Sequence, residues 1–159
     1  MSNYLIPLMV IVPMLCAILV NAFAKFNKSI KVLTFVVAIC LPIIPLISNY
    51  GLHFFGGYTP MVDNVTGVIY HPAITYSFDM LQQIFIAPIG LITFLVAFIY
   101  LSKYKKASGQ YLFLLFMGTA SVTALMLTDD IFNMFVFFEI LALVQVGIVI
   151  ASPMDYSYE

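Results

Sequence analysis

Five long apolar segments, separated by short polar stretches, constrain this chain more than any other feature. A helix needs about 20 mostly apolar residues to cross the hydrocarbon core of a bilayer. Of the 159 residues, 64% are hydrophobic and 8% are charged, against about 25% charged in ordinary soluble domains. The sequence therefore predicts an all-α integral membrane protein in which residues 1–159 form a single membrane domain. The expected spans are 4–24, 30–49, 79–101, 111–127 and 131–151.

The same composition argues against several classes of function. Six lysines against seven acids give a net charge of −1, without the basic surface that a nucleic-acid-binding protein needs. The sequence has no CxxC pair, no cluster of histidine and cysteine, no nucleophile elbow, no P-loop and no dinucleotide-binding fingerprint. We therefore expect no catalytic residue, metal or cofactor. We expect Cys16 and Cys40, both in mid-span, to be small buried apolar residues, and His53 and His71 lie apart in one loop.

The lysines predict the orientation of the chain in the membrane. They lie in two connections, between the first and second spans and between the third and fourth, or, for Lys31, in the first turn of the second span: Lys25, Lys28, Lys31, Lys103, Lys105 and Lys106. These connections share one side of the membrane if the chain crosses five times, and basic loops stay in the cytoplasm. We therefore expect a multi-pass protein of the cell membrane with its N-terminus outside and its C-terminus in the cytoplasm.

The first span and the long connection after the second span both need interpretation. Ala22-Phe23-Ala24 has the small side chains of a signal-peptide cleavage site, but the leader is uncharged and the apolar stretch is long. A retained helix is therefore favoured over a signal peptide. The connection between spans two and three has glycine turns and β-branched and aromatic residues, which predict a short hairpin on the outer surface.

Glu139 is the only charged residue deep inside an expected span. It lies about nine residues into the fifth span, which places it roughly 13 Å below the outer surface. A carboxylate at that depth costs at least about 2 kcal/mol, so it must be protonated, paired or hydrated. The functional interpretation is a proton or ion relay, and the alternative is a neutral acid hydrogen-bonded between helices. Because no lysine lies deep inside a span, either Glu139 stays protonated or its countercharge comes from outside this chain.

Three further polar residues are possible accessories to Glu139. Asp130 precedes the fifth span, and Ser121 and Thr123 lie within the fourth. The two hydroxyls could line water in a proton path. The favoured alternative is helix packing through small residues and weak hydrogen bonds.

Three stretches resemble one family of membrane proteins. Ser121–Glu139 contains Asp-Ile-Phe followed by an aromatic run and a glutamate, and it is similar to the fifth-helix signature of antiporter-like subunits. Ser77–Leu81 is similar to the Asp-x-Leu that opens the third helix of that family, and Gly56–Pro60 resembles the preceding Gly-Gly-aromatic stretch. The family comprises the proton-translocating subunits of respiratory complex I, Mrp sodium/proton antiporter subunits and their counterparts in membrane-bound hydrogenases.

The resemblance implies a function for the chain and a role for Glu139. In the family, the fifth-helix glutamate pairs with a lysine two helices later, and full-length members extend well beyond the fifth helix. The resemblance therefore implies that this chain is part of a split subunit, or a reduced subunit, in the membrane arm of a redox-driven complex that moves protons or sodium ions. Glu139 would be its intramembrane relay acid. The expected partners are the bilayer and other membrane subunits, one of them supplying a lysine opposite Glu139.

Two interpretations of the chain remain open from the sequence. In the first, the chain belongs to the ion path of a membrane oxidoreductase or a cation/proton antiporter, without being catalytic alone. In the second, it is a structural subunit that braces the same kind of complex and has no ion path of its own, because the lysines of the path are absent.

Overall fold

The computed structural model describes residues 5–23, 25, 27–48, 51–57, 61–62, 69–70, 73–104 and 108–151. It contains five helices: α1 (Leu5–Ala22), α2 (Asn27–Ile47), α3 (Met80–Lys103), α4 (Gly109–Leu127) and α5 (Ile131–Ala151). All five are long and apolar enough to cross a membrane. The predicted fold class, an all-α membrane protein with five transmembrane helices, is thereby confirmed. The described residues do not include Lys105, Lys106 or His71, nor the expected span ends at residues 4, 24 and 49. Cys16 is buried as expected, whereas Cys40 is exposed on the surface of α2.

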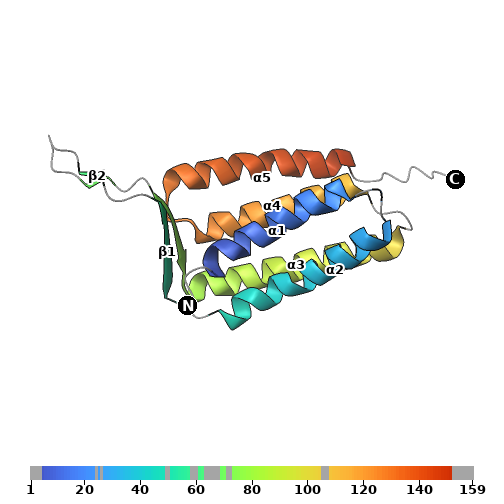
Figure 1. The fold of residues 1–159 in the computed structure, drawn as a ribbon, viewed down its shortest axis with the longest axis horizontal. Coiled ribbons are helices and arrows are strands. Elements are labelled where there is room, and N and C mark those ends of the chain that lie inside the picture. The colour runs from blue at the N-terminus through green and yellow to red at the C-terminus, as the bar shows by residue number, and fades with distance from the viewer. Residues whose placement is uncertain are drawn as a thin grey trace.

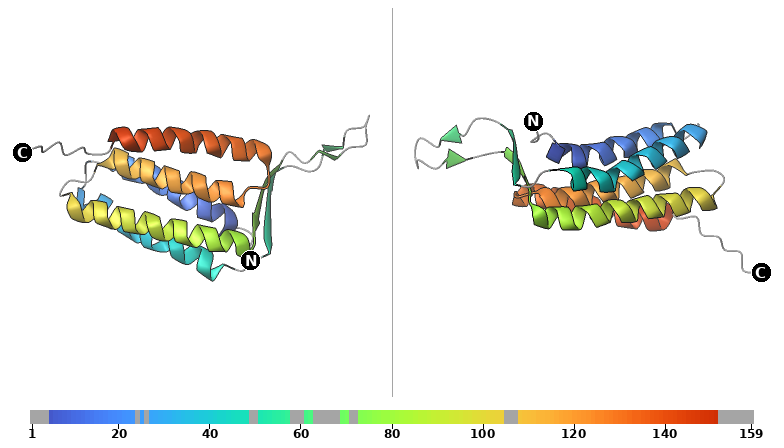
Figure 2. Two further views of the ribbon diagram at one scale, coloured as in Figure 1. Left: turned by 180° about the vertical axis from the view of Figure 1, so that it is seen from behind. Right: turned by 90° about the horizontal axis from the view of Figure 1, so that it is seen from below.

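The five helices run side by side in a bundle (Figure 1). The most extensive helix contacts join α1 to α4, α2 to α3, and α4 to α5. In Figure 1 and in the left-hand view of Figure 2, α5 forms one edge of the bundle and α2 and α3 form the opposite edge, with α1 and α4 between them. The fifth helix therefore has one principal helical neighbour within the chain, which is α4.

Local capping explains where α3 and α4 begin. Asp79 precedes α3, and its backbone N–H donates to Oε1 of Gln82 at 3.0 Å. Ser108 precedes α4, and its hydroxyl oxygen accepts from the backbone N–H of Tyr111 at 3.4 Å. Side-chain acceptors of this kind satisfy N–H groups that a helix start leaves without partners. The fourth helix consequently begins at Gly109, two residues before the expected start at residue 111.

A close backbone contact joins α2 and α3. A Cβ atom on Gly90 would lie 2.7 Å from the nitrogen of Pro42, so glycine is required at this crossing. Nearby, Nε2 of Gln83 donates to the carbonyl of Pro45 at 2.9 Å. Between α3 and α4, the hydroxyls of Thr93 and Thr119 share a buried hydrogen bond of 2.8 Å. Small residues and interhelical hydrogen bonds are the usual means of holding membrane helices together.

The connection between α2 and α3 forms an antiparallel hairpin. Its strands are β1 (Leu52–Gly57), β2 (Met61–Val62), β3 (Ile69–Tyr70) and β4 (Ala73–Phe78). β1 pairs with β4, in a register that opposes Leu52 to Phe78, and β2 pairs with β3. Figures 1 and 2 show the β1–β4 pair lying across one end of the bundle, with β2 and β3 extending away from it. The phenyl ring of Phe78 is fully buried where β4 meets the helices.

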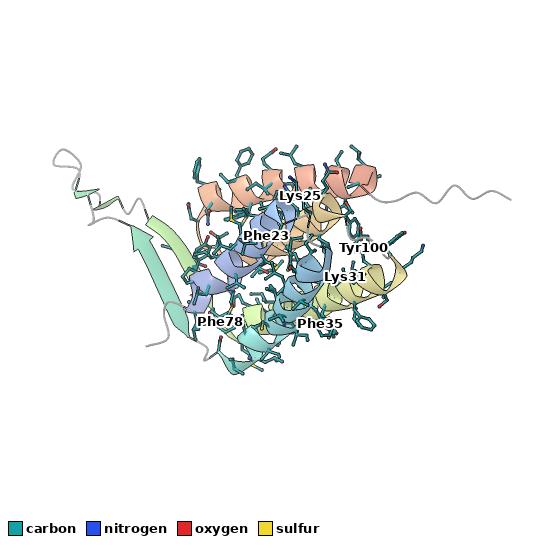
Figure 3. All side chains as sticks on the ribbon, turned by 45° about the vertical axis from the view of Figure 1, so that its right-hand side comes forward. Phe23, Lys25, Lys31, Phe35, Phe78 and Tyr100 are labelled. Carbon is teal, nitrogen blue, oxygen red and sulfur yellow. The ribbon has the colours of Figure 1, made fainter. Side chains whose placement is uncertain are left out.

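The lysines lie at the other end of the bundle. Lys25 follows α1, Lys28 and Lys31 lie in the first turns of α2, and Lys103 ends α3. Figure 3 shows Lys25 and Lys31 at the end away from the strands. A stacked set of tyrosines joins the helices there, with ring centroids 4.3 Å apart for Tyr100 and Tyr111. The described lysines thus share one end of the bundle, as the five-span prediction requires.

Candidate functional site

Glu139 lies in the middle of α5 with its side chain on the outside of the bundle. It follows the start of the helix by eight residues, or about 12 Å along the axis. Its side chain is exposed, and so are Phe135 and Leu143, one turn before and after it. Among the described residues, Glu139 has no hydrogen-bond or ion-pair partner. The carboxylate therefore points away from the helices of this chain.

The whole of α5 is poorly covered within the bundle. Two of its 21 residues are buried, compared with nine of the 19 residues of α4. Its buried residues are Asn133, near its start, and Val144. Val144 lies close to Gly118 of α4: a Cβ atom added to Gly118 would be 3.1 Å from Cγ1 of Val144. The remaining surface of α5 carries large apolar side chains together with the single acid, Glu139.

Asp130 lies at the start of α5 and not beside Glu139. Its Oδ1 accepts a hydrogen bond from the backbone N–H of Phe132, and its Oδ2 accepts one from Asn133, both at 3.2 Å. These are the contacts of an N-cap, which satisfies the free N–H groups of the first turn. Nine residues separate Asp130 from Glu139, or about 13 Å along the helix. The geometry thus gives Asp130 a structural contact at the helix end.

Ser121 and Thr123 lie inside the bundle, away from the exposed face of α5. Ser121 is 1% exposed, and its hydroxyl donates to the carbonyl of Met117 at 2.9 Å. Thr123 is 3% exposed and lines a small internal cavity of ≈ 10 Å³ together with Thr119 and Gly90. A space of that size holds about one water molecule. The structure therefore does not gather Glu139, Asp130, Ser121 and Thr123 into one site.

Two of the residues that line this cavity, Leu41 and Pro45, lie one turn apart on α2. Because proline has no N–H, Pro45 cannot donate to the carbonyl of Leu41 one turn earlier. Backbone groups freed by proline inside a membrane helix are commonly satisfied by neighbouring hydroxyls or by ordered water.

A polar cluster that sequence reasoning missed fixes the start of α5. The Ser77 hydroxyl on β4 donates to Oδ1 of Asp129 at 2.8 Å, and the N–H of Asp129 donates to the carbonyl of Thr75 at 3.1 Å. Nδ2 of the buried Asn133 donates to the hydroxyl oxygens of Tyr76 and Thr128 at 3.3 and 3.0 Å. The cluster ties the hairpin to the connection between α4 and α5. The signal in the sequence that could have indicated this cluster is the pair of short polar stretches at residues 75–77 and 128–130, both expected on the outer side of the membrane.

The fold and the composition together define a multi-pass membrane protein. No protein-family model matches the chain. An uncharacterized protein of Methanocaldococcus jannaschii, MJ1309, is 37% identical over 159 residues, which cover 99% of this chain and 31% of that protein. The chain thus spans about a third of the length of this curated relative.

A solved structure shares the fold. It is a chain of the membrane-bound sulfane sulfur reductase, an archaeal respiratory membrane complex. The two chains superpose with a TM-score of 0.66 and 22% sequence identity, over 87% of this chain and 28% of the other. The arrangement of five helices therefore occurs as a part of a longer chain in a respiratory membrane complex.

Proposed function

We propose that this chain is a membrane-arm component of a redox-driven multisubunit complex that moves protons or sodium ions, with Glu139 as its intramembrane relay acid. The complex would be of the complex I, membrane-bound hydrogenase or Mrp type that the antiporter-like motif suggests. The fold shared with a chain of a respiratory membrane complex supports the assignment to a membrane arm.

The observation that carries the proposal is the position of Glu139 on the uncovered face of α5. A carboxylate facing hydrocarbon in the middle of a span is strongly unfavourable, so intramembrane acids face protein or water and commonly serve ion pathways. The described helices of this chain do not cover Glu139. Its cover is therefore proposed to be a membrane subunit, or a further segment of a longer chain, that packs along α5.

The proposed partner presents a lysine opposite Glu139. Burial of the site would favour the neutral acid, and a nearby ammonium would favour the carboxylate. A group held between these opposing influences can change its protonation when the charge of its neighbour changes. Uptake and release of a proton by Glu139 could then be coupled to redox-driven changes elsewhere in the complex.

The second candidate function is that of a bracing subunit. It is favoured by the positions of the lysines, which lie in connections or within five residues of a helix end, so that Glu139 has no cationic partner among the described residues. In that case the α5 face would pack against a neighbour, and Glu139 would be a neutral acid hydrogen-bonded across the interface.

Replacement of Glu139 by glutamine tests the two candidates. Glu139→Gln keeps the shape of the side chain and removes its titration, so the complex should assemble normally. Redox-driven ion accumulation, measured in sealed membrane vesicles with an electron donor supplied, should fall strongly. Assembly is checked by co-purification of the other membrane subunits.

Asp130→Asn is the matched control, because it makes the same exchange of carboxyl for amide at the end of α5. Asparagine also caps helices well, so this variant should retain both assembly and ion accumulation. If Glu139→Gln leaves the ion gradient at the wild-type level in an assembled complex, the relay role is wrong and the bracing role replaces it.

A further inference from the structure

A surface groove runs between α2 and α3 toward the end of the bundle that carries the lysines. Its volume is ≈ 320 Å³, within the range of small-molecule sites. At one end it is bordered by Lys31 and Ser102. The rest of its lining is apolar: Val32, Phe35, Val36, Phe98 and Leu101.

The apolar part of the groove is shaped by aromatic rings. The Phe35 centroid lies 5.9 Å from that of Phe94 and 6.4 Å from that of Phe98, which gives a continuous aromatic wall from α2 to α3. Val32 and Val36, one turn apart on α2, are 58% and 53% exposed beside it. Because these helices cross the membrane, the groove is open to lipid chains and not to water.

Depth along α2 separates a polar part of the groove from an apolar part. Lys31 lies four residues after the start of α2, or about 6 Å along the helix, and Phe35 lies about 6 Å deeper. Figure 3 shows Lys31 nearer the lysine end and Phe35 farther along α2 toward the strands. A lysine near the end of a membrane helix places its ammonium at the level of the lipid headgroups.

Lys31 is held in place but keeps donors for a ligand. Its Nζ donates to the carbonyl of Tyr104 at 3.2 Å. An ammonium has three N–H donors, so two remain for an external acceptor. The described side chains at this end of the bundle also include those of Lys25 and Lys103 and contain no aspartate or glutamate. The local charge therefore favours an anion.

We propose that the groove binds one anionic phospholipid. Its acyl chain lies against Phe35, Val36 and Phe98, and its phosphate accepts hydrogen bonds from the ammonium of Lys31. The site is independent of Glu139, which lies on α5 at the opposite edge of the bundle (Figure 1).

Native mass spectrometry tests whether the Lys31 ammonium selects an anionic lipid. The full chain is purified in mild detergent with its co-purifying subunits. The protein is equilibrated with equal amounts of phosphatidylglycerol and phosphatidylcholine that carry identical acyl chains. The wild type should retain phosphatidylglycerol in preference to phosphatidylcholine. Loss of one charge-assisted contact should reduce that preference about tenfold in Lys31→Gln. Lys25→Gln removes the same charge from an exposed position outside the groove and should retain the preference.

Val36→Trp tests the groove itself, because an indole at position 36 occupies the space of the acyl chain while Lys31 is unchanged. This variant should lose bound phosphatidylglycerol. Leu15→Trp, at an equally exposed position on α1, should retain it. The proposal is overturned if the wild type retains both lipids equally, if Lys25→Gln reduces binding as much as Lys31→Gln, or if Val36→Trp binds phosphatidylglycerol like the wild type.

Discussion

Gly90 of α3 lies against the backbone of Pro42 of α2, so closely that a Cβ atom on Gly90 would sit 2.7 Å from the proline nitrogen and 2.8 Å from the carbonyl carbon of Leu41. Both neighbours are backbone atoms, which cannot rotate out of the way as the end of a side chain can. The crossing of α2 and α3 therefore depends on the absence of a side chain at position 90.

Gly90→Ala should consequently destabilise the bundle. Overpacking of this kind costs about 1–3 kcal/mol. Thermal denaturation in detergent, measured as loss of the monodisperse peak, should therefore occur at a clearly lower temperature than in the wild type. Gly118→Ala is the matched control, because its Cβ would meet only Cγ1 of Val144 at 3.1 Å on the loosely packed α5. If both variants lower the denaturation temperature equally, the α2–α3 contact at Gly90 is not tighter than the α4–α5 contact at Gly118.

Asp130 should act as a helix cap. Asp130→Ala removes both acceptors for the N–H groups of Phe132 and Asn133 and should cost about 1 kcal/mol, whereas Asp130→Asn should cost much less. Hydrogen exchange at the first turn of α5 measures the difference. An accessory role in ion movement would instead give an Asp130→Asn variant that is stable and assembled but deficient in ion accumulation.

The exposed face of α5 should be covered by protein in the assembled complex. A photoreactive amino acid at Leu143, which is 72% exposed one turn from Glu139, should form a cross-link to another membrane subunit in native membranes. The same probe at Ile92 of α3, 60% exposed on an apolar surface that lipid can cover, is the control. Cross-links from Ile92 but none from Leu143 would argue against a partner at α5.

The orientation in the membrane can be tested by cysteine labelling after replacement of Cys16 and Cys40 by alanine. A membrane-impermeant reagent added to intact cells should label a cysteine at Asn64, in the segment between β2 and β3. It should not label one at Ser108, which caps α4 at the lysine end. The expectation follows from retention of basic connections in the cytoplasm. Labelling of Ser108 in intact cells would reverse the topology.

Hydropathy is a local property, so the number and the approximate limits of the spans followed from the sequence. The ends of helices depend on single capping contacts, such as the Ser108 hydroxyl at the start of α4, and for that reason the expected limits differ by a few residues. Glycine turns and β-branched residues likewise indicated a hairpin after the second span, whereas its contacts with Asp129 and Asn133 connect segments more than 50 residues apart.

The sequence by itself determined how deep Glu139 lies, because depth follows from counting residues along a helix of fixed rise. Only the tertiary structure decided which way the carboxylate faces. The three polar residues of α5, Asn133, Glu139 and Gln145, point in different directions around the helix, so its sequence has no polar stripe to indicate a buried side. The packing of α5 on α4, which buries Val144, leaves Glu139 on the exposed side of the helix. The packing of α4 likewise encloses Ser121 and Thr123 within the bundle, because side-chain direction is fixed by contacts between helices.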